Sequence, residues 1–130
     1  MPVFGFADVL AVGVGGFLGA VCRWLLSSIV QDGFRLPMGT LAVNVLGCFA
    51  LGFFAELAST YGLLTRSERL FLMAGFAGSF TTFSTFIYES VMMGNENVVM
   101  GLTNIVVSIT LGILGLMLGK TVAVVVMGRG

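Results

Sequence analysis

The chain has 130 residues, of which 58% are hydrophobic and only 9% are charged, and its formal net charge is zero. Soluble domains carry roughly 25% charged residues, so this composition predicts a membrane protein, and no basic block or tail suggests a nucleic-acid partner. At about 20 residues for each spanning helix, the length allows about four spans and leaves no room for a soluble domain.

Apolar runs predict four spanning helices in a single transmembrane domain, residues 1–130. The first two cover about residues 6–29 and 38–61, and each ends at a polar loop. The third covers about residues 70–93, and the fourth covers about residues 98–118, where Gly119 and Lys120 stop it. Both termini and the middle loop then share one side, which carries most of the basic residues, namely Arg66, Arg69, Lys120 and Arg129 against Arg35 and Arg23. This mild bias favours the cytoplasm for the termini.

Small and polar residues recur every four positions on three of the spans, and side chains four apart share a helix face. The series are Ala11, Gly15, Gly19 and Arg23; Thr40, Asn44, Cys48, Gly52 and Glu56; and Asn104, Ser108 and Gly112. The glycine series of the first span is typical of close helix packing, and Arg23 is typical of a side chain that anchors a span near its end. Asn44 and Asn104 indicate an interior or a water path. Four short helices enclose little space, so we expect a dimer.

The third span contains the stretch GFAGSFTTFSTF at residues 75–86, which would make a poor continuous helix. Its glycines and hydroxyls weaken a helix, and we expect the chain to unwind around Gly75 and Gly78. A break at membrane depth frees the backbone groups from which ion sites are made. Phe80, Phe83 and Phe86 recur every three residues. The positive edge of such rings can approach an anion.

In these motifs the chain resembles the Fluc or CrcB family of small bacterial fluoride channels. The resemblance rests on G-x-x-G-A-x-x-R-W from Gly16, G-T-L-x-V-N from Gly39 and G-F-x-G-x-x-T-T-F-S-T-F from Gly75. It implies an all-α membrane protein with four transmembrane helices, the third broken near the membrane centre, that forms an antiparallel, dual-topology homodimer. It also implies a passive, fluoride-selective channel in the bacterial inner membrane, with two pores in each dimer, that lets fluoride leave the cytoplasm down its gradient.

The resemblance assigns three kinds of role to single residues. The fluoride pore would be lined by Phe83, Phe86, Asn44, Ser84, Thr85, Asn104 and Ser108. The backbone carbonyls of Gly78 and Thr81 would hold a structural Na⁺ at the dimer interface, the one cofactor expected. Gly75 and Arg23 would be structural. The chain departs from some members in having Asn104 in place of a tyrosine and Gly112 in place of a serine.

Two other interpretations stay open. A small four-helix proton-coupled multidrug exporter would need an ionisable carboxylate deep in the first span, where this chain has only Asp8 near the start, and Glu56 and Glu89 lie towards the ends of their spans. A structural membrane protein with no transport activity would use the polar series for packing alone, which leaves the hydroxyls and phenylalanines of residues 75–86 unexplained. We expect no enzyme, because the sequence has no histidine and no G-x-S-x-G motif.

Overall fold

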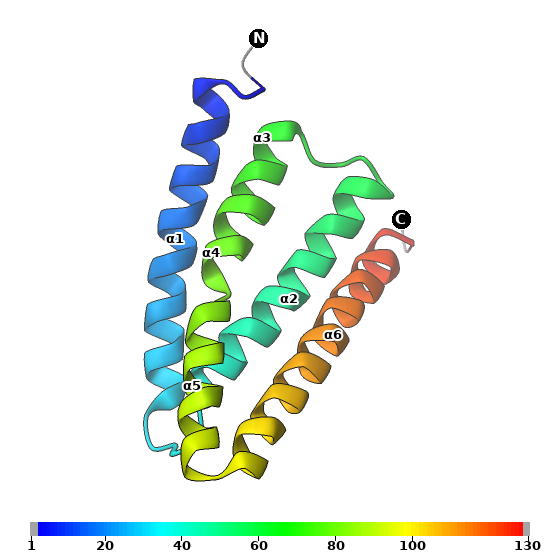
Figure 1. Cartoon of the computed structure of the whole chain (residues 1–130). Helices are drawn as coiled ribbons and strands as arrows, with labels where there is room; N and C mark the ends of the chain where they lie inside the picture. Colours follow the sequence, from blue (N-terminus) through cyan, green and yellow to red (C-terminus); the bar gives the residue numbers. More distant parts are fainter. Residues whose placement is uncertain (1–2, 129–130) are drawn as a thin grey trace.

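The computed structural model describes residues 3–128, and every regular element within this range is a helix (Figure 1). α1 covers Phe6–Gln31 and α2 covers Met38–Ser59. The third long helix is made of α3 (Arg66–Arg69), the π-helical stretch η1 (Leu70–Ala77), α4 (Gly78–Phe80) and α5 (Phe83–Glu96), and α6 covers Val98–Gly128. Four stretches are long and apolar enough to cross a membrane: α1, α2, Arg66–Glu96 and α6. The prediction of four membrane-length helices is therefore confirmed; Arg129 lies outside the described residues.

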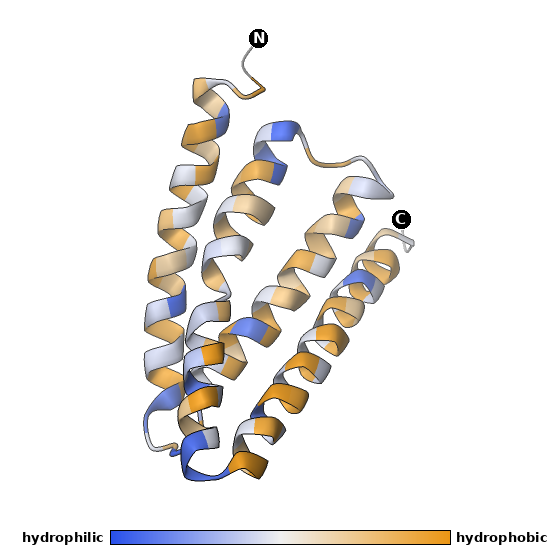
Figure 2. Cartoon of the chain, viewed as in Figure 1, coloured by the Kyte–Doolittle hydropathy of each residue, from blue (hydrophilic) through white to orange (hydrophobic). Residues whose placement is uncertain are grey.

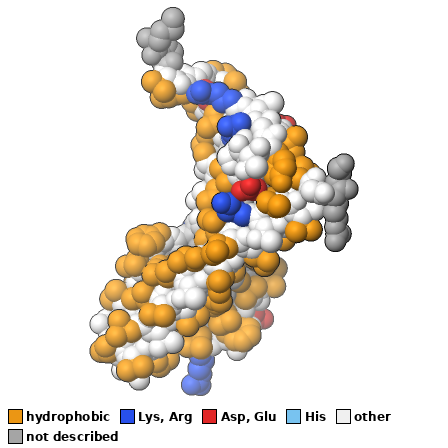
Figure 3. All heavy atoms as spheres, turned by 90° about the vertical axis from the view of Figure 1, so that its right-hand side faces the viewer, with side chains coloured by type: hydrophobic (Ala, Val, Ile, Leu, Met, Phe, Trp, Pro, Cys, Tyr) orange, Lys and Arg blue, Asp and Glu red, His pale blue; other side chains and the backbone are white. Residues whose placement is uncertain are grey.

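The helices run alternately up and down, and α1 lies beside the upper half of the third helix while α6 lies along α2 (Figure 1). Both described ends of the chain therefore lie at one end of the bundle. Hydrophobic residues fill most of the helix lengths, and hydrophilic residues gather at the loops (Figure 2). Hydrophobic side chains also cover much of the outer surface, which suits contact with lipid (Figure 3).

Glycines bring the helix backbones into direct contact. An added Cβ on Gly75 of η1 would lie 2.7 Å from the Val12 carbonyl oxygen of α1, and one on Gly19 would meet the Phe76 carbonyl. On the other side of the bundle, an added Cβ on Gly52 of α2 would meet the Leu116 carbonyl of α6. The glycine series of the first span thus serves close packing, as predicted.

α6 does not end where the sequence predicted, because neither Gly119 nor Lys120 stops it. An added Cβ on Gly119 would meet the Phe49 carbonyl of α2, so this glycine allows a close approach inside a continuous helix. The Lys120 Nζ atom lies 3.7 Å from Glu56 Oε2, which gives the charge a partner on the same neighbour. With both residues held by α2, the helix continues to Gly128.

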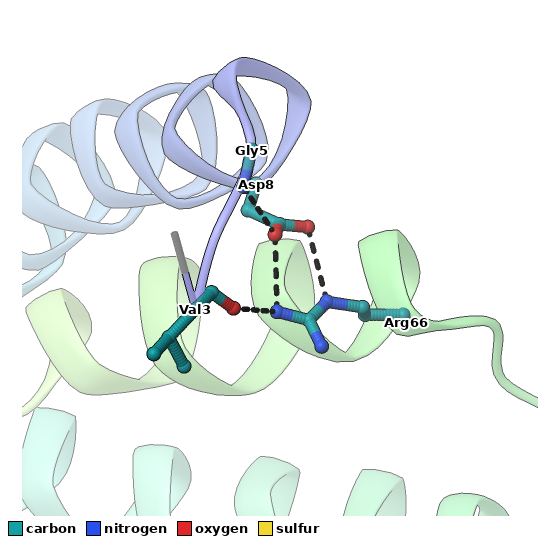
Figure 4. A network of polar contacts seen from close by, with 4 residues as sticks. All are labelled: Val3, Gly5, Asp8 and Arg66. Atoms are coloured by element: carbon teal, nitrogen blue, oxygen red, sulfur yellow. Dashed lines mark hydrogen bonds and ion pairs between the residues drawn. The ribbon is translucent and has the colours of Figure 1, made fainter. Parts of the chain in front are cut away.

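The start of the third helix is fixed by polar contacts and lies a turn earlier than predicted. The backbone N–H of Thr65 donates to Glu68 Oε2 at 2.8 Å, and the Thr65 hydroxyl accepts from the Glu68 N–H, which makes a capping box. Arg66 binds both carboxylate oxygens of Asp8, at 3.0 and 3.2 Å, and the Val3 carbonyl at 3.0 Å (Figure 4). These bonds join the start of the third helix to the start of α1.

The glycine contacts give a test of the packing. Gly19→Val should destabilise the protein, because its side chain would meet the backbone of η1, and overpacking costs about 1–3 kcal/mol. Gly13→Val is the matched control, since an added Cβ on Gly13 meets nothing within 4 Å. Thermal unfolding of both variants in detergent measures the difference. Equal stability of the two variants would contradict the close α1–η1 contact.

Candidate functional site

The third helix is broken at Thr81 and Thr82, in the middle of the Arg66–Glu96 stretch. Thr81 has φ −85° and ψ 157°, and Thr82 has φ −144° and ψ 111°, so both residues are extended. A break in this helix was predicted within residues 75–81, and it lies at the end of that stretch rather than at Gly75 or Gly78. Gly75 stays in η1 because it is packed against α1, and Gly78 begins α4.

The side chain of Asn44 holds the broken backbone from α2. Its Oδ1 accepts from the Thr82 N–H at 2.7 Å, and its Nδ2 donates to the Thr82 carbonyl at 3.1 Å. One carboxamide thus satisfies both backbone groups of an extended residue. This pairing of the Thr82 N–H and carbonyl stabilises the break, because an unpaired backbone group within a membrane costs several kcal/mol. We call these two bonds the Asn44–Thr82 clasp.

Thr82 also starts α5. Its hydroxyl oxygen accepts from the Thr85 N–H at 3.3 Å and donates to the Thr85 hydroxyl at 3.0 Å, which makes it the N-cap of the helix. A helix N-terminus carries partial positive charge from its unpaired N–H groups. The break therefore places the positive end of a new helix in the middle of the bundle.

A cavity of about 420 Å³ lies between α2, the broken helix and α6. Asn44, Thr82 and Ser108 supply polar groups to its lining, together with the rings of Phe83 and Phe86. The two ring centroids are 6.1 Å apart, with their planes at 56°. Among the described residues that line this cavity, none is charged. The cavity is thus mainly apolar, with aliphatic side chains such as Leu51, Ile113 and Leu116 in its lining, and its few hydrogen-bonding groups are uncharged.

The two rings differ in how far this chain covers them. Phe86 is only 6% exposed, whereas Phe83 is 75% exposed. Phe83 therefore presents its ring mainly to whatever lies outside the subunit.

The structure brings together some of the predicted site residues and separates others. The cavity lining includes Asn44, Phe83, Phe86, Ser108, Gly78 and Thr81. It does not include Ser84 and Thr85, which are exposed on α5, or Asn104, whose Nδ2 donates to the Ser90 hydroxyl at 2.8 Å. Arg23 is half-buried on α1, which contributes nothing to the lining. The roles of these residues stay predictions.

Two backbone carbonyls at the break lose the N–H group that a continuous helix would supply. The partner of the Gly78 carbonyl would be the Thr82 N–H, which donates to Asn44 instead. The partner of the Thr81 carbonyl would be the Thr85 N–H, which donates to the Thr82 hydroxyl. Carbonyl oxygens are ligands of hard cations, so both residues fit the predicted cation site.

Sequence reasoning missed several polar contacts of this region. The Thr40 hydroxyl donates to Glu89 Oε1 at 2.8 Å, while Glu89 Oε2 is buried and has no hydrogen-bond partner among residues 3–128. Thr40 begins the polar series of α2, and Glu89 lies about two turns inside the end of α5. Buried Ser90 was missed because a single serine in an apolar helix gives no signal of its own.

Four membrane-length helices, with an open, mainly apolar cavity that holds a few uncharged polar groups at a helix break, define a small multi-pass membrane protein. The chain belongs to the CrcB family, because the family model described as "CrcB-like protein, Camphor Resistance (CrcB)" matches residues 10–120.

Proteins similar to the chain carry a common name. The "Fluoride-specific ion channel FluC" of Methanococcus maripaludis is 48% identical over 90 residues, which are 69% of this chain and 73% of the relative. The protein of the same name from Methanocaldococcus jannaschii is 47% identical over 89 residues, or 68% of this chain and 71% of the relative. That of Prosthecochloris aestuarii is 51% identical over 87 residues, or 65% and 66%.

The clasp gives the second prediction. Asn44→Ala leaves the Thr82 N–H and carbonyl unpaired, and an unsatisfied buried polar group costs about 1–3 kcal/mol. Cys48→Ala is the control, because it shortens a side chain one turn along the same helix, in the lining of the same cavity. Thermal unfolding in detergent should show a clearly larger loss for Asn44→Ala. A loss no larger than that of the control would mean that the clasp does not hold the break.

Proposed function

We propose that this protein is a passive, fluoride-selective ion channel of a bacterial inner membrane. The observation that carries the proposal is the uncharged cavity at the helix break, where an amide, hydroxyls and two phenylalanine rings meet. The name that the relatives carry, "Fluoride-specific ion channel FluC", supports the choice of ion.

The chemistry of the lining suits a small, strongly hydrated anion. A pore must replace the hydration shell, yet it must hold the ion weakly enough to release it. The Asn44 Nδ2 carries two hydrogens, and the Thr82 carbonyl takes one, which leaves the second for an ion. The edges of the Phe83 and Phe86 rings add attraction without a full charge.

We further propose that the pore is completed by a second copy, in an antiparallel homodimer with two pores. The exposed ring of Phe83 supports this, and so do the exposed hydroxyls of Ser84 and Thr85 close to it. Polar side chains within a membrane usually face protein or water rather than lipid. A partner that covers this face would place its own ring beside the cavity of the first subunit.

A structural Na⁺ at the dimer interface is part of the same proposal. The carbonyls of Gly78 and Thr81 have lost their helical N–H partners, as described above. Two such carbonyls are too few ligands for a hard cation, whereas a two-fold axis would supply both pairs. Na⁺ would then neutralise the freed carbonyl dipoles and join the two subunits.

In this proposal the channel lets fluoride leave the cytoplasm. Fluoride enters a cell from acidic surroundings as HF and is trapped inside as the anion, so a passive pore is enough to lower its concentration. The buried carboxylate of Glu89 favours the proton-coupled exporter as a second candidate. Glu89 does not line the cavity, so the channel accounts better for the site.

Fluoride efflux from proteoliposomes, with chloride as the control ion, tests the channel. Phe83→Ile, Phe86→Ile and Asn44→Asp should each lower fluoride efflux about tenfold or more, the effect of losing roughly 1.4 kcal/mol. Asn44→Asp should be the most severe, because it adds a negative charge to an anion path. Phe17→Ile is the control, since Phe17 is 68% exposed on α1 and far from the cavity lining.

Near-normal fluoride efflux in folded samples of all three variants would contradict the assignment of these residues to the pore. Efflux of the unaltered protein that requires a proton gradient would favour the exporter instead.

Insertion in both orientations is tested by labelling a single cysteine. Asp32→Cys, in a protein whose two native cysteines are replaced, places a thiol in the exposed loop after α1. An antiparallel dimer predicts that about half of the copies are labelled from outside intact cells and the rest only after permeabilisation. Labelling of all copies or of none from outside would rule out the antiparallel dimer.

A further inference from the structure

We propose that Ser90 is a positioning residue for the Phe86 ring, and that Asn104 acts through Ser90 rather than on the ion. This inference rests on the proposed function, since Phe86 is a residue that we place in the fluoride pore. It assigns different roles to the two polar residues of the α6 series, Asn104 and Ser108. Ser108 lines the cavity, whereas Asn104 holds the helix that carries the ring.

One buried hydroxyl joins the turn of Phe86 to α6. Ser90 is 3% exposed, and its hydroxyl donates to the Phe86 carbonyl at 2.7 Å. The same oxygen accepts from Asn104 Nδ2 at 2.8 Å. A serine hydroxyl has a single hydrogen, so Ser90 commits its one donor to Phe86 and an acceptor position to Asn104. The backbone of the Phe86 turn is thereby linked to a side chain of the neighbouring helix.

α5 needs such contacts with neighbouring helices because it is not a continuation of α4. The two helices are separated by the extended residues Thr81 and Thr82, so the orientation of α5 depends on its own contacts. Among residues 3–128, the Asn104–Ser90 bond is the side-chain hydrogen bond that joins α5 to α6. Within a membrane, apolar side chains pack against lipid as well as against protein, so hydrogen bonds and close packing decide how helices pair.

The α6 backbone lies close to α5 at this level. An added Cβ on Gly101 of α6 would lie 2.8 Å from the Ser90 carbonyl oxygen and 2.7 Å from the Gly94 Cα. The bond from Asn104 to Ser90 therefore spans a tightly packed contact. We therefore expect a change at either side chain to shift the Phe86 turn.

The position of the Asn104 amide argues against direct contact with the ion. Asn104 does not line the cavity that contains Phe83 and Phe86. It lies instead beside a separate, apolar space of about 300 Å³, whose lining includes Pro37, Met38 and Met93. Ser108, one turn further along α6, does line the cavity at the break.

The experiment places a single fluorinated phenylalanine at position 86 and follows its fluorine NMR signal in purified protein. Asn104→Ala and Ser90→Ala should each shift the signal, and the double variant should show no larger shift than the single ones. Ser59→Ala is the matched control for Ser90, because the Ser59 hydroxyl makes the same kind of bond, 2.7 Å to the Ala55 carbonyl, at an exposed site. Thr103→Ala is the control on α6.

A signal that stays in place in Asn104→Ala would overturn the inference, and this readout does not depend on fluoride transport. Fluoride efflux gives the second readout. Each single variant should lose about three- to tenfold in rate, the size of one lost interhelical hydrogen bond, and the double variant should lose no more. If the fold-loss in efflux rate of the double variant equals the product of the two single losses, Asn104 acts independently of Ser90. That result would also overturn the proposal. If Ser90→Ala fails to fold, Asn104→Ala alone still decides by NMR.

Discussion

The structure depends on the Asn44–Thr82 clasp, in which one carboxamide makes the hydrogen bonds that two peptide groups of a continuous helix would otherwise make. A helix can stop and restart within a membrane only if another group satisfies the backbone at the interruption. Asn44 does so with bonds of 2.7 and 3.1 Å. The other features of the site follow from this break: the N-terminus of α5, the freed carbonyls at its border, and the two phenylalanine rings on the first turn of the new helix. The clasp thus pairs the backbone at the point where these groups meet.

The two halves of the third helix are held by different means. The upper half, η1 and α4, packs on α1 through glycines such as Gly19 and Gly75, where backbones touch and side-chain bonds are scarcely needed. The lower half, α5, also meets a glycine backbone, that of Gly101 on α6, and in addition it is held by polar side chains that reach it from α2 and α6, as in the bonds of Thr40 to Glu89 and of Asn104 to Ser90. Backbone contact leaves little room for movement, while hydrogen bonds set direction as well as distance. This arrangement suits a site in which the upper half of the helix stays fixed and the lower half sets the orientation of the Phe83 and Phe86 rings.

The sequence was enough to predict the number of spans and the faces that point inward, because both follow from local hydrophobicity and a spacing of four residues. The polar series of α2 does face protein along its length, from Thr40 at one end to Glu56 at the other. The sequence located the break only to within several residues, since local propensity pointed to the glycines before it, whereas the decisive partner of Thr82 lies 38 residues away on α2. The predicted end of α6 was wrong for the same reason. Lys120 has an ion-pair partner on α2, which the local pattern around it does not show. Local patterns give the faces of helices, and only the packed bundle shows which partner each polar group finds.

The placement of charge completes the argument for a channel. Two ion pairs lie near one end of the bundle, Asp8 with Arg66 at 3.0 Å and Glu56 with Lys120 at 3.7 Å, and the half-buried Arg23 lies on α1, outside the lining of the cavity. A full positive charge beside an anion in a medium of low dielectric constant attracts it strongly, and an ion held in that way leaves slowly. Conduction requires binding that is favourable yet shallow. Single amide hydrogens, hydroxyls and ring edges meet that condition because each offers only a partial charge. The chain therefore keeps its formal charges where they fix the helices and uses partial charges where an ion would pass.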